Sequence, residues 1–389
     1  MDIASILASY DLSNLTIASL GGHSALDVCH GAKKHGFKTL VVAQKGREKT
    51  YAHYYKTRDG KGCIDDVILV DHFSDVLKPE IQEELQRRNT IFIHNRYFWV
   101  YFKDFSAVEN DFHVPIYGNR TLVKLEERDQ PNNQYELLQK AGIRIPKIVR
   151  KGNSRLSENE VSKALDTHFG NRGGPVIVKV NEATRGYERA FFIATTSVAY
   201  FDISQKMIAD GTITKPDLDN AVIEEFVLGA QINFNYFYSN IHDELELMGT
   251  DTRRQTSLDG FLRLDAHTQT QLIAQGIKPS MIETGHIACT TKESILEKAF
   301  EVGEKFVATL KKENLGMIGP FALQGAIAAE NGREEIVIFD VSMRIPGSPG
   351  TRFTPLSGYL YGESISYGER IALELKEAVS SHGLSQLLT

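Results

Sequence analysis

The sequence has few cysteines and no paired cysteine motif. Cys29, Cys63 and Cys289 are the three cysteines among 389 residues, and no two of them have CxxC spacing. This argues against a disulfide framework and against a cysteine-based zinc site, and we expect reduced, mostly structural thiols in a cytoplasmic protein. The twelve histidines likewise form no HExxH or other paired metal-ligand spacing.

Long apolar runs and an excess of positive charge are also absent. The sequence has no stretch of about 18 apolar residues, so no membrane-spanning helix is expected. The first residues, MDIASILASYDLSN, lack the basic region and long apolar core of a signal peptide. The formal net charge of −6 disfavours a general nucleic-acid-binding protein. We therefore expect a protein that acts on small molecules, without a membrane or nucleic-acid partner.

The sequence does contain, near its start, a regular alternation of strands and helices. A chain of 389 residues exceeds one ordinary hydrophobic core, so two or three lobes are expected. In the first lobe, residues 1–124, apolar runs predict strands, and the segments between them predict helices near 25–35 and 79–88. The predicted strands are Leu15–Leu20, Lys38–Ala43, Val67–Val70 and Thr90–Ile93. This pattern predicts a doubly wound parallel sheet with right-handed crossovers.

Polar residues follow the first and fourth predicted strands, at the edge where open α/β sheets bind ligands. His23 and Ser24 lie in the turn GGHS, directly before a predicted helix whose free amides favour a phosphate. The turn is not GxGxxG, so it gives little support to a dinucleotide site. Ser24 has an alternative role as a helix N-cap, with Asp27 completing a capping-box-like pair. His94 opens the second polar stretch, His-Asn-Arg.

A lysine inside an apolar strand is the first candidate for phosphate binding. Lys179 lies in Pro175–Val180, PVIVKV, where burial of an ammonium is costly unless it meets an anion. The alternative is an edge-strand lysine whose charged end reaches solvent. The next loop, residues 181–189, is polar and contains Arg185 and one glycine. A loop of this kind between two strands can fold over phosphates.

An acidic strand end and a polar segment follow. Glu224 and Glu225 end the apolar run Ala221–Leu228, where backbone groups can bind a purine and an acid can bind a ribose. The alternative is a pair of surface carboxylates. Asn233 lies in the next predicted strand, which forms a hairpin, and Gly249–Asp265 is polar enough to predict a substrate loop. A capping box at Thr290 and Glu293 predicts the start of a long amphipathic helix.

The stretch Ile336–Arg352 places charge in a buried strand. Asp340, Ser342 and Arg344 alternate with apolar residues and therefore share one face. Burying an acid and a guanidinium costs several kcal/mol per ion unless each finds a partner or a ligand. We expect a metal–phosphate group at this strand end, with Gln324 on the same face if the strand containing it pairs in a suitable register.

The order of these parts resembles the ATP-grasp superfamily. Over nearly its whole length the chain more closely resembles the archaeal formate-dependent synthetases of purine biosynthesis, the PurP family. The blocks that carry the resemblance are IASLGGHSAL, GAKKHGFKTL, KAGIRIPK, IEEFVLGAQINFNYFYS, DELELMGTDTRR, MIGPFALQ and GERIALELKEA. The resemblance implies an α/β fold, α+β in its C-terminal part. It comprises a Rossmann-like pre-ATP-grasp domain at residues 1–124 and an ATP-grasp domain at 125–389, with a small lid subdomain at about 148–228.

The resemblance also implies an activity and a set of site residues. The activity is ligation of formate to the 5-amino group of AICAR, giving FAICAR for IMP biosynthesis, with ATP converted to ADP and phosphate through formyl phosphate. The implied cofactor is Mg²⁺ or Mn²⁺, and the implied assembly is a homo-oligomer. The implied roles are catalysis by Arg344 and Asp340; metal binding by Gln324 and Asp340; ATP binding by Lys179, Arg185, Glu224, Glu225 and Val227; and substrate binding by His23, Ser24, His94, Asn233 and Arg254.

Several segments differ from the family pattern and keep two alternatives open. The loop after Lys179 has one glycine, Asn95 and Arg96 stand where the family has Gly-Ser, Asp340 replaces a usual glutamate, and IPGSPG follows Arg344. One alternative is an ATP-grasp carboxylate–amine ligase with a different substrate. The other is a nucleotide-binding paralogue without turnover.

Overall fold

The computed structural model describes most of the chain in three connected sheets. The described residues are 3–102, 105–128, 130–154, 156–171, 173–180, 191–277, 279, 282–330, 332–347 and 349–389. The whole loop predicted at residues 181–189, with Arg185, lies outside them. Among the described residues, no helix has the length and hydropathy needed to cross a membrane.

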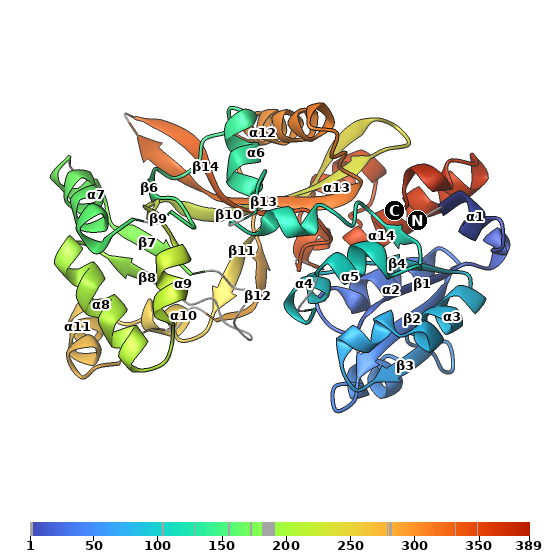
Figure 1. The fold of residues 1–389 in the computed structure, drawn as a ribbon. Helices are drawn as coiled ribbons and strands as arrows, with labels where there is room; N and C mark the ends of the chain where they lie inside the picture. The colour runs from blue at the N-terminus through green and yellow to red at the C-terminus, as the bar shows by residue number, and fades with distance from the viewer. Residues whose placement is uncertain are drawn as a thin grey trace.

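The N-terminal sheet confirms the predicted parallel arrangement (Figure 1). Its strand order is β3-β2-β1-β4-β5, and all neighbours are parallel. Because β2 and β4 flank β1 on opposite sides, the connections diverge beside β1, the place where open sheets bind ligands. The elements are α1 (Ile3–Leu7), β1 (Thr16–Leu20), α2 (Ala25–Lys34), β2 (Lys38–Gln44), β3 (Asp66–Val70), α3 (Pro79–Arg87), β4 (Thr90–Ile93), α4 (Tyr97–Val100), α5 (Phe105–Asn110) and β5 (Ile116–Tyr117).

A small antiparallel sheet follows, drawn in green at the left of Figure 1. Its strand order is β6-β9-β7-β8, and its helices enclose a separate apolar core built on Val176, Val178 and Ile223. The predicted strand around Lys179 is confirmed as β7. The elements are β6 (Ile148–Arg150), α7 (Glu158–Gly170), β7 (Val176–Lys179), β8 (Phe191–Ala194), α8 (Ser197–Ala209), α9 (Lys215–Asn220) and β9 (Val222–Glu225).

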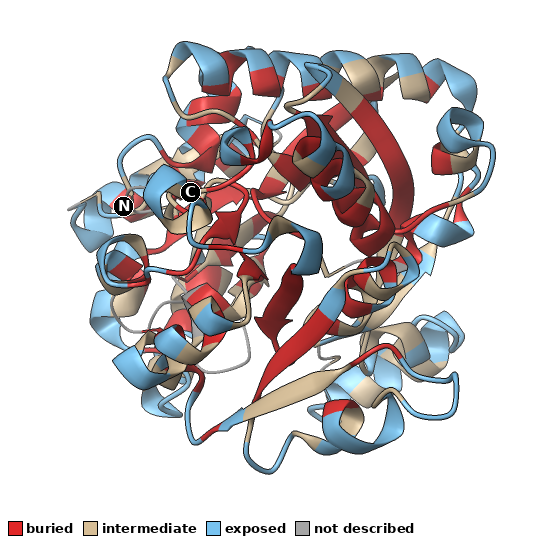
Figure 2. Ribbon diagram, turned by 90° about the vertical axis from the view of Figure 1, so that its right-hand side faces the viewer, coloured by how far each residue is buried: buried red, intermediate tan, exposed pale blue. Residues whose placement is uncertain are grey.

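The third sheet has long antiparallel strands in the order β12-β11-β10-β13-β14. The middle parts of β10 and β11 are buried, whereas β12 has no buried residue; Figure 2 shows long buried strands in red, and Figure 1 shows α12 and α6 covering one face. The elements are α6 (Gln134–Lys140), β10 (Ala230–Ser239), β11 (Glu244–Gln255), α10 (Leu258–Phe261), α11 (Ala266–Ala274), β12 (Glu283–Ala288), α12 (Glu293–Lys312), β13 (Gly319–Glu330) and β14 (Arg333–Ser342).

Two local predictions for this sheet are wrong. Gly249–Asp265 is not one polar loop, because its first part, through Gln255, continues β11, and Thr250 and Asp251 are buried. The helix predicted from a Thr290–Glu293 capping box begins at Glu293 with Lys292 as N-cap, and no side chain caps it. Packing of its apolar stripe fixes this helix: Ile295, Ala299, Phe306, Val307 and Leu310 are buried against the sheet.

The C-terminal helices return to the N-terminal sheet. After α13 (Leu356–Tyr361), α14 (Tyr367–Ser380) packs on α2. A Cβ built on Gly31 would lie 2.1 Å from the Gly368 carbonyl carbon, so only glycines permit this approach. The helices share one apolar core with β1 and β4.

Candidate active site

A cavity of about 610 Å³ is lined by residues from all three parts of the fold. Residues of the small sheet line it beside a broad face of the long sheet, and His23 and Arg96 come from the N-terminal lobe. Six of the predicted site residues line this cavity: His23, Lys179, Asn233, Gln324, Asp340 and Arg344. The structure therefore brings together residues that are more than 300 positions apart in the chain.

A row of polar side chains crosses the long sheet at this cavity. Asp340 pairs with Gln324, Gln324 with Asn233, and Asn233 with Asp251. Residues directly opposite in antiparallel strands point to the same face, so these four side chains form one continuous row. The suitable register expected for Gln324 and Asp340 is confirmed. A bulge beside this pair, between Gln324 and Gly325, locally breaks the strand register.

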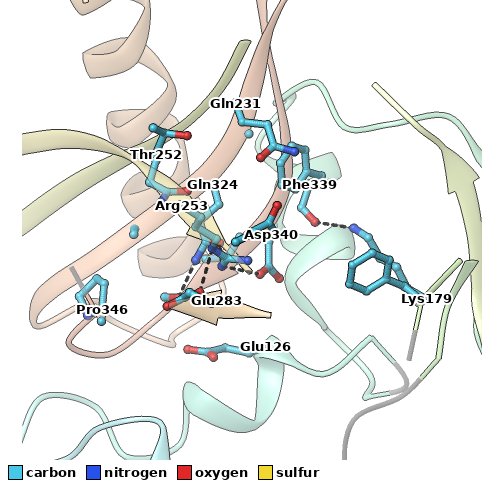
Figure 3. Close-up of a pocket in the computed structure, with 18 of the residues that line it drawn as sticks. Glu126, Lys179, Gln231, Thr252, Arg253, Glu283, Gln324, Phe339, Asp340 and Pro346 are labelled. Atoms are coloured by element: carbon cyan, nitrogen blue, oxygen red, sulfur yellow. Dashed lines mark hydrogen bonds and ion pairs between the residues drawn. The ribbon is translucent and has the colours of Figure 1, made fainter. Parts of the chain in front are cut away.

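Asp340 is a buried carboxylate surrounded by cationic groups. It is 4% exposed, and its Oδ1 lies 2.9 Å from Nη2 of Arg128. Its Oδ2 lies 3.9 Å from Nη2 of Arg253, which also donates a hydrogen bond to Gln324 Oε1 (Figure 3). Gln324 Nε2 in turn donates to Ser342 Oγ at 3.1 Å. Carboxylate, amide and hydroxyl oxygens are the ligands that Mg²⁺ accepts, and here the Asp340 carboxylate already faces two guanidinium groups.

Lys179 faces Asp340 from the small sheet. Its Nζ donates to the Phe339 carbonyl at 3.1 Å and lies 2.5 Å from Glu224 Oε1, and Tyr135 donates to the other oxygen of Glu224. Burial lowers the pKa of Lys179 to about 8 in spite of the nearby Glu224 carboxylate. Glu224 therefore supplies an anionic partner for Lys179 within the protein, and phosphate binding by Lys179 stays a prediction. Figure 3 shows the ammonium at the side of the cavity opposite Glu283.

The predicted hinge residues lie at different depths. Glu224 is 1% exposed and lies next to Lys179. The alternative interpretation of Glu224 as a surface carboxylate is therefore wrong. Glu225 is half-buried at the end of β9 and accepts from the Lys147 amide at 3.4 Å. Val227 is also half-buried and follows Phe226, which lines the cavity.

The GGHS turn places His23 at the cavity and Ser24 against the opposite loop. Ser24 has a left-handed backbone (φ 75°) and does not cap α2; its Oγ donates to the Pro346 carbonyl at 2.8 Å. The capping interpretation of Ser24 is therefore wrong. Asn95 fixes the turn, because its Nδ2 donates to Ser19 Oγ and to the Leu20 and His23 carbonyls at 3.2–3.3 Å.

His23 is neutral in this environment. Burial, together with the positive charges of Arg344 and Arg96, lowers its pKa to about 3. Its Nδ1 is buried and has no hydrogen-bond partner among the described residues. A buried ring nitrogen of this kind suits a hydrogen bond to a bound polar molecule.

Arg344 is held by an acid from the N-terminal half of the chain. Its Nη2 lies 3.2 Å from Glu126 Oε2, and Glu126 Oε1 accepts from the Met343 amide at 2.6 Å. Burial raises the pKa of Glu126, whereas the positive charge of Arg344 acts to lower it. This pair lines the cavity next to the polar row.

Two predicted substrate residues point elsewhere. Arg254 pairs with Asp259 at 2.7 Å, and the cavity-lining residue is its neighbour Arg253. His94 is buried and is not among the residues that line the cavity; its Nδ1 lies 3.3 Å from the Tyr117 carbonyl, and burial lowers its pKa to about 4. Successive residues of a strand face opposite sides, which explains why Arg253 and Arg254 separate.

The sequence interpretation missed a set of charges on β11 and β12. Asp251, Arg253, Glu283 and His286 join the polar row through ion pairs. Asp251 and Arg253 alternate within TDTRR, so the strand period that singled out Asp340 and Arg344 was available as a signal. The interpretation of Gly249–Asp265 as a loop left this alternating pattern unused.

Two family models match the chain. One, described as a protein of unknown function (DUF1246), matches residues 17–149, and another, described as a domain of unknown function (DUF1297), matches residues 200–389. The chain is also 35% identical to a Methanosphaera stadtmanae protein over 100% of this chain and 98% of that protein. A Methanopyrus kandleri protein is 34% identical, with 97% and 96% covered. Both are named 5-formaminoimidazole-4-carboxamide-1-(beta)-D-ribofuranosyl 5'-monophosphate synthetase.

The chain belongs to this synthetase family. Among solved structures, it is similar to the IMP biosynthesis protein PurP from Thermococcus kodakaraensis, with a TM-score of 0.66, 23% identity, and 96% of this chain and 100% of that chain covered. It also resembles the biotin carboxylase domain of the Hydrogenobacter thermophilus 2-oxoglutarate carboxylase in complex with MgADP, with a TM-score of 0.59, 11% identity and 92% and 69% coverage. These structural similarities confirm the ATP-grasp fold that the sequence predicted for this chain.

Proposed function

We propose that this protein ligates formate to the 5-amino group of AICAR and forms FAICAR, ADP and phosphate. The observation that carries the proposal is the full-length identity of about 35% to proteins named as the synthetase of this product. The polar row beside Lys179 supports it, because a cationic and oxygen-rich cavity suits a nucleotide phosphate and a small acid.

ATP and Mg²⁺ fit the cavity end formed by Lys179, Gln324 and Asp340. Gln324 and Asp340 would hold the metal, which would neutralise phosphate charge when bound. Among the described residues, no three His, Cys, Asp or Glu side chains gather as a potential metal site. Such an ion would therefore complete its coordination with phosphate oxygens and water, as Mg²⁺ commonly does.

The proposed reaction has two displacements. A formate oxygen attacks the γ-phosphorus of ATP, the bond to ADP breaks, and formyl phosphate forms. The AICAR amine then attacks the formyl carbon, phosphate leaves with the electron pair of the broken C–O bond, and the amine loses a proton. The protein contributes positive charge around the transferred phosphoryl group, from Lys179 and Arg344, where charge develops.

The acceptor would lie toward the N-terminal lobe. His23 presents a neutral ring there, and Asn95 fixes its turn. A neutral imidazole offers both a donor and an acceptor, which suits a carboxamide or hydroxyl group of a nucleotide. We also propose that the small sheet, at about residues 148–228, acts as the lid over ATP.

The experiment is ADP release by purified protein with Mg²⁺ and ATP, adding formate and AICAR separately and together. ADP and FAICAR formed only when both are present support the proposal. ADP release only with another acid or amine assigns a different ligase, and ATP binding without ADP release under any condition assigns a paralogue without turnover. Either of these results would overturn it.

A further inference from the structure

A chain of alternating charges runs from the edge of the long sheet into the cavity. Asp251 is fully buried and accepts from Asn233 at 2.7 Å, from Asn235 at 2.5 Å and from His286 Nδ1 at 2.5 Å. His286 Nε2 lies 3.0 Å from Glu283 Oε1. Glu283 Oε2 lies 3.2 Å from Nε of Arg253, which reaches the polar row.

His286 acts in this chain as a cation. Burial alone would lower its pKa, but hydrogen bonds to Asp251 and Glu283 outweigh burial and raise its pKa to about 9. Both ring nitrogens then donate, so the imidazolium has a fixed orientation between two carboxylates. The same contacts, with Arg253, hold the pKa of Glu283 at about 2 despite its burial.

This arrangement fixes one guanidinium. Nε of Arg253 forms an ion pair with Glu283 at 3.2 Å without hydrogen-bond geometry, and Nη2 donates to Gln324 with Asp340 nearby (Figure 3). These contacts use Nε and Nη2, and none of them uses Nη1. A side chain held at two of its three nitrogens keeps the third in a constant place without losing further rotamer freedom on binding.

The other cavity arginines close to the row are engaged differently. Arg344 pairs with Glu126, and Arg128 lies over the Tyr135 ring and bonds to Asp340 and the Phe339 carbonyl. Arg253 stands between the proposed metal ligands and Glu283, at the side of the cavity remote from Lys179 (Figure 3). A carboxylate that attacks a phosphate must lie beside the metal–phosphate end and needs a cation of its own.

We propose that Arg253 binds the carboxylate of the small acid substrate and that Asp251, His286 and Glu283 are positioning residues that orient it. The inference rests on the proposed function for the identity of the acid, formate. The inference adds a binding subsite for the carboxylate of this acid, at Arg253 of β11 and facing Gln324 and Asp340. A guanidinium suits this role because it presents planar N–H donors to a carboxylate and keeps its charge at any working pH.

The test compares Arg253→Ala, Arg253→Lys and Glu283→Gln with a control, Arg333→Ala, whose side chain is exposed at the start of β14. Binding of ¹³C-formate is measured by NMR in the presence of Mg·ADP, and ATP binding is measured separately. We expect the formate dissociation constant to rise about ten- to hundredfold in Arg253→Ala, because a charge-assisted pair is lost. ATP affinity should change less than threefold, and the control should match the wild type.

The positioning role has its own readouts. Free guanidinium should restore formate binding to Arg253→Ala but not to Glu283→Gln, which retains the arginine and misplaces it. Arg253→Lys should weaken formate binding less than Arg253→Ala. Circular dichroism checks that each variant is folded.

Two results would overturn the inference: unchanged formate binding in Arg253→Ala, or an equal loss of ATP and formate affinity. Its failure is distinguishable from failure of the proposed function. If the wild type makes FAICAR and Arg253→Ala retains the formate KM, the function stands and the inference fails. If formate binds in an Arg253-dependent manner but no FAICAR forms, the subsite stands and the function fails.

Discussion

Gln324 and Asp340 stand opposite each other on β13 and β14 and present their side-chain oxygens to the same cavity. Asp340 supplies the only formal negative charge of this pair, and two arginines already lie close to it. As the proposed metal ligands, the pair would combine one charged and one neutral oxygen, which suits an ion that is shared with a nucleotide.

Replacing Asp340 with asparagine should abolish metal-dependent turnover, because an amide cannot supply the missing charge. Mn²⁺ binding in the presence of ADP, followed by electron paramagnetic resonance, should weaken at least about tenfold. Glu335→Gln, at a half-buried position earlier on the same strand, is the control and should bind Mn²⁺ normally. Near-normal turnover rates in Asp340→Asn would show that Asp340 is not a ligand of the metal.

Replacing Lys179 with alanine should raise the KM for ATP about tenfold or more, because a desolvated ammonium is removed from the phosphate end. The variant leaves the buried Glu224 carboxylate with Tyr135 as a donor but without its cation, so stability should fall as well, and circular dichroism checks that the protein is folded. The matched control is Lys163→Ala, an exposed lysine of α7 in the same lobe. An unchanged ATP dependence in Lys179→Ala would remove this lysine from the site.

The His286 ion pairs predict a pH-dependent stability. The folded pKa of about 9 exceeds the ordinary value of 6.5, so the contribution is complete below pH 6.5 and is lost as pH rises through 9. Asp251 and Glu283 supply the facing negative charges, and Arg253 lies beyond Glu283. The difference in unfolding free energy between the wild type and His286→Asn should decrease by a few kcal/mol at most from pH 6 to pH 10. Urea unfolding at several pH values measures it, and a pH-independent difference would contradict a charged His286.

A second buried ion cluster predicts a large effect on stability alone. Arg370 on α14 lies 2.7 Å from Glu246 of β11 and 2.7 Å from Glu374, and all three are nearly or fully buried. Arg370→Ala leaves two buried carboxylates without their cation and should cost about 3–5 kcal/mol. Denaturant unfolding measures the loss. In Arg370→Met/Glu246→Leu/Glu374→Leu the charges are removed together, and recovery of stability there would assign the loss to unpaired charge.

Local sequence patterns predicted the strands well because each is short, apolar and bounded by turn residues. β4 matches the prediction of Thr90–Ile93, and β7 places Lys179 in a buried strand as expected. The face shared by Asp340 and Ser342 followed from strand period alone, and the register with Gln324 then decided which residues meet. That register depends on pairing between distant segments.

The two incorrect predictions, for Gly249–Asp265 and for Ser24, have a common physical cause. Polarity suggested a loop at Gly249–Asp265, but Asp251 is buried in a strand because Asn233, Asn235 and His286 satisfy its carboxylate. A local pattern cannot supply partners from other strands. Likewise, the local sequence favours Ser24 as a cap of its own helix, whereas its hydroxyl donates to the carbonyl of Pro346, 322 positions away.

The close contact of α2 with α14 also orders events during synthesis. Leu15, Ile17 and Ile93 belong to the same apolar core as Ile371, Leu375 and Leu388. While the chain emerges from the ribosome, this core contains α2 but lacks α14, because the helix that fits against Gly31 has not yet been translated. The apolar side chains that pack against Ile371 and Leu375 therefore gain these partners only when the last few dozen residues have been made. The lobe that is made first is completed last.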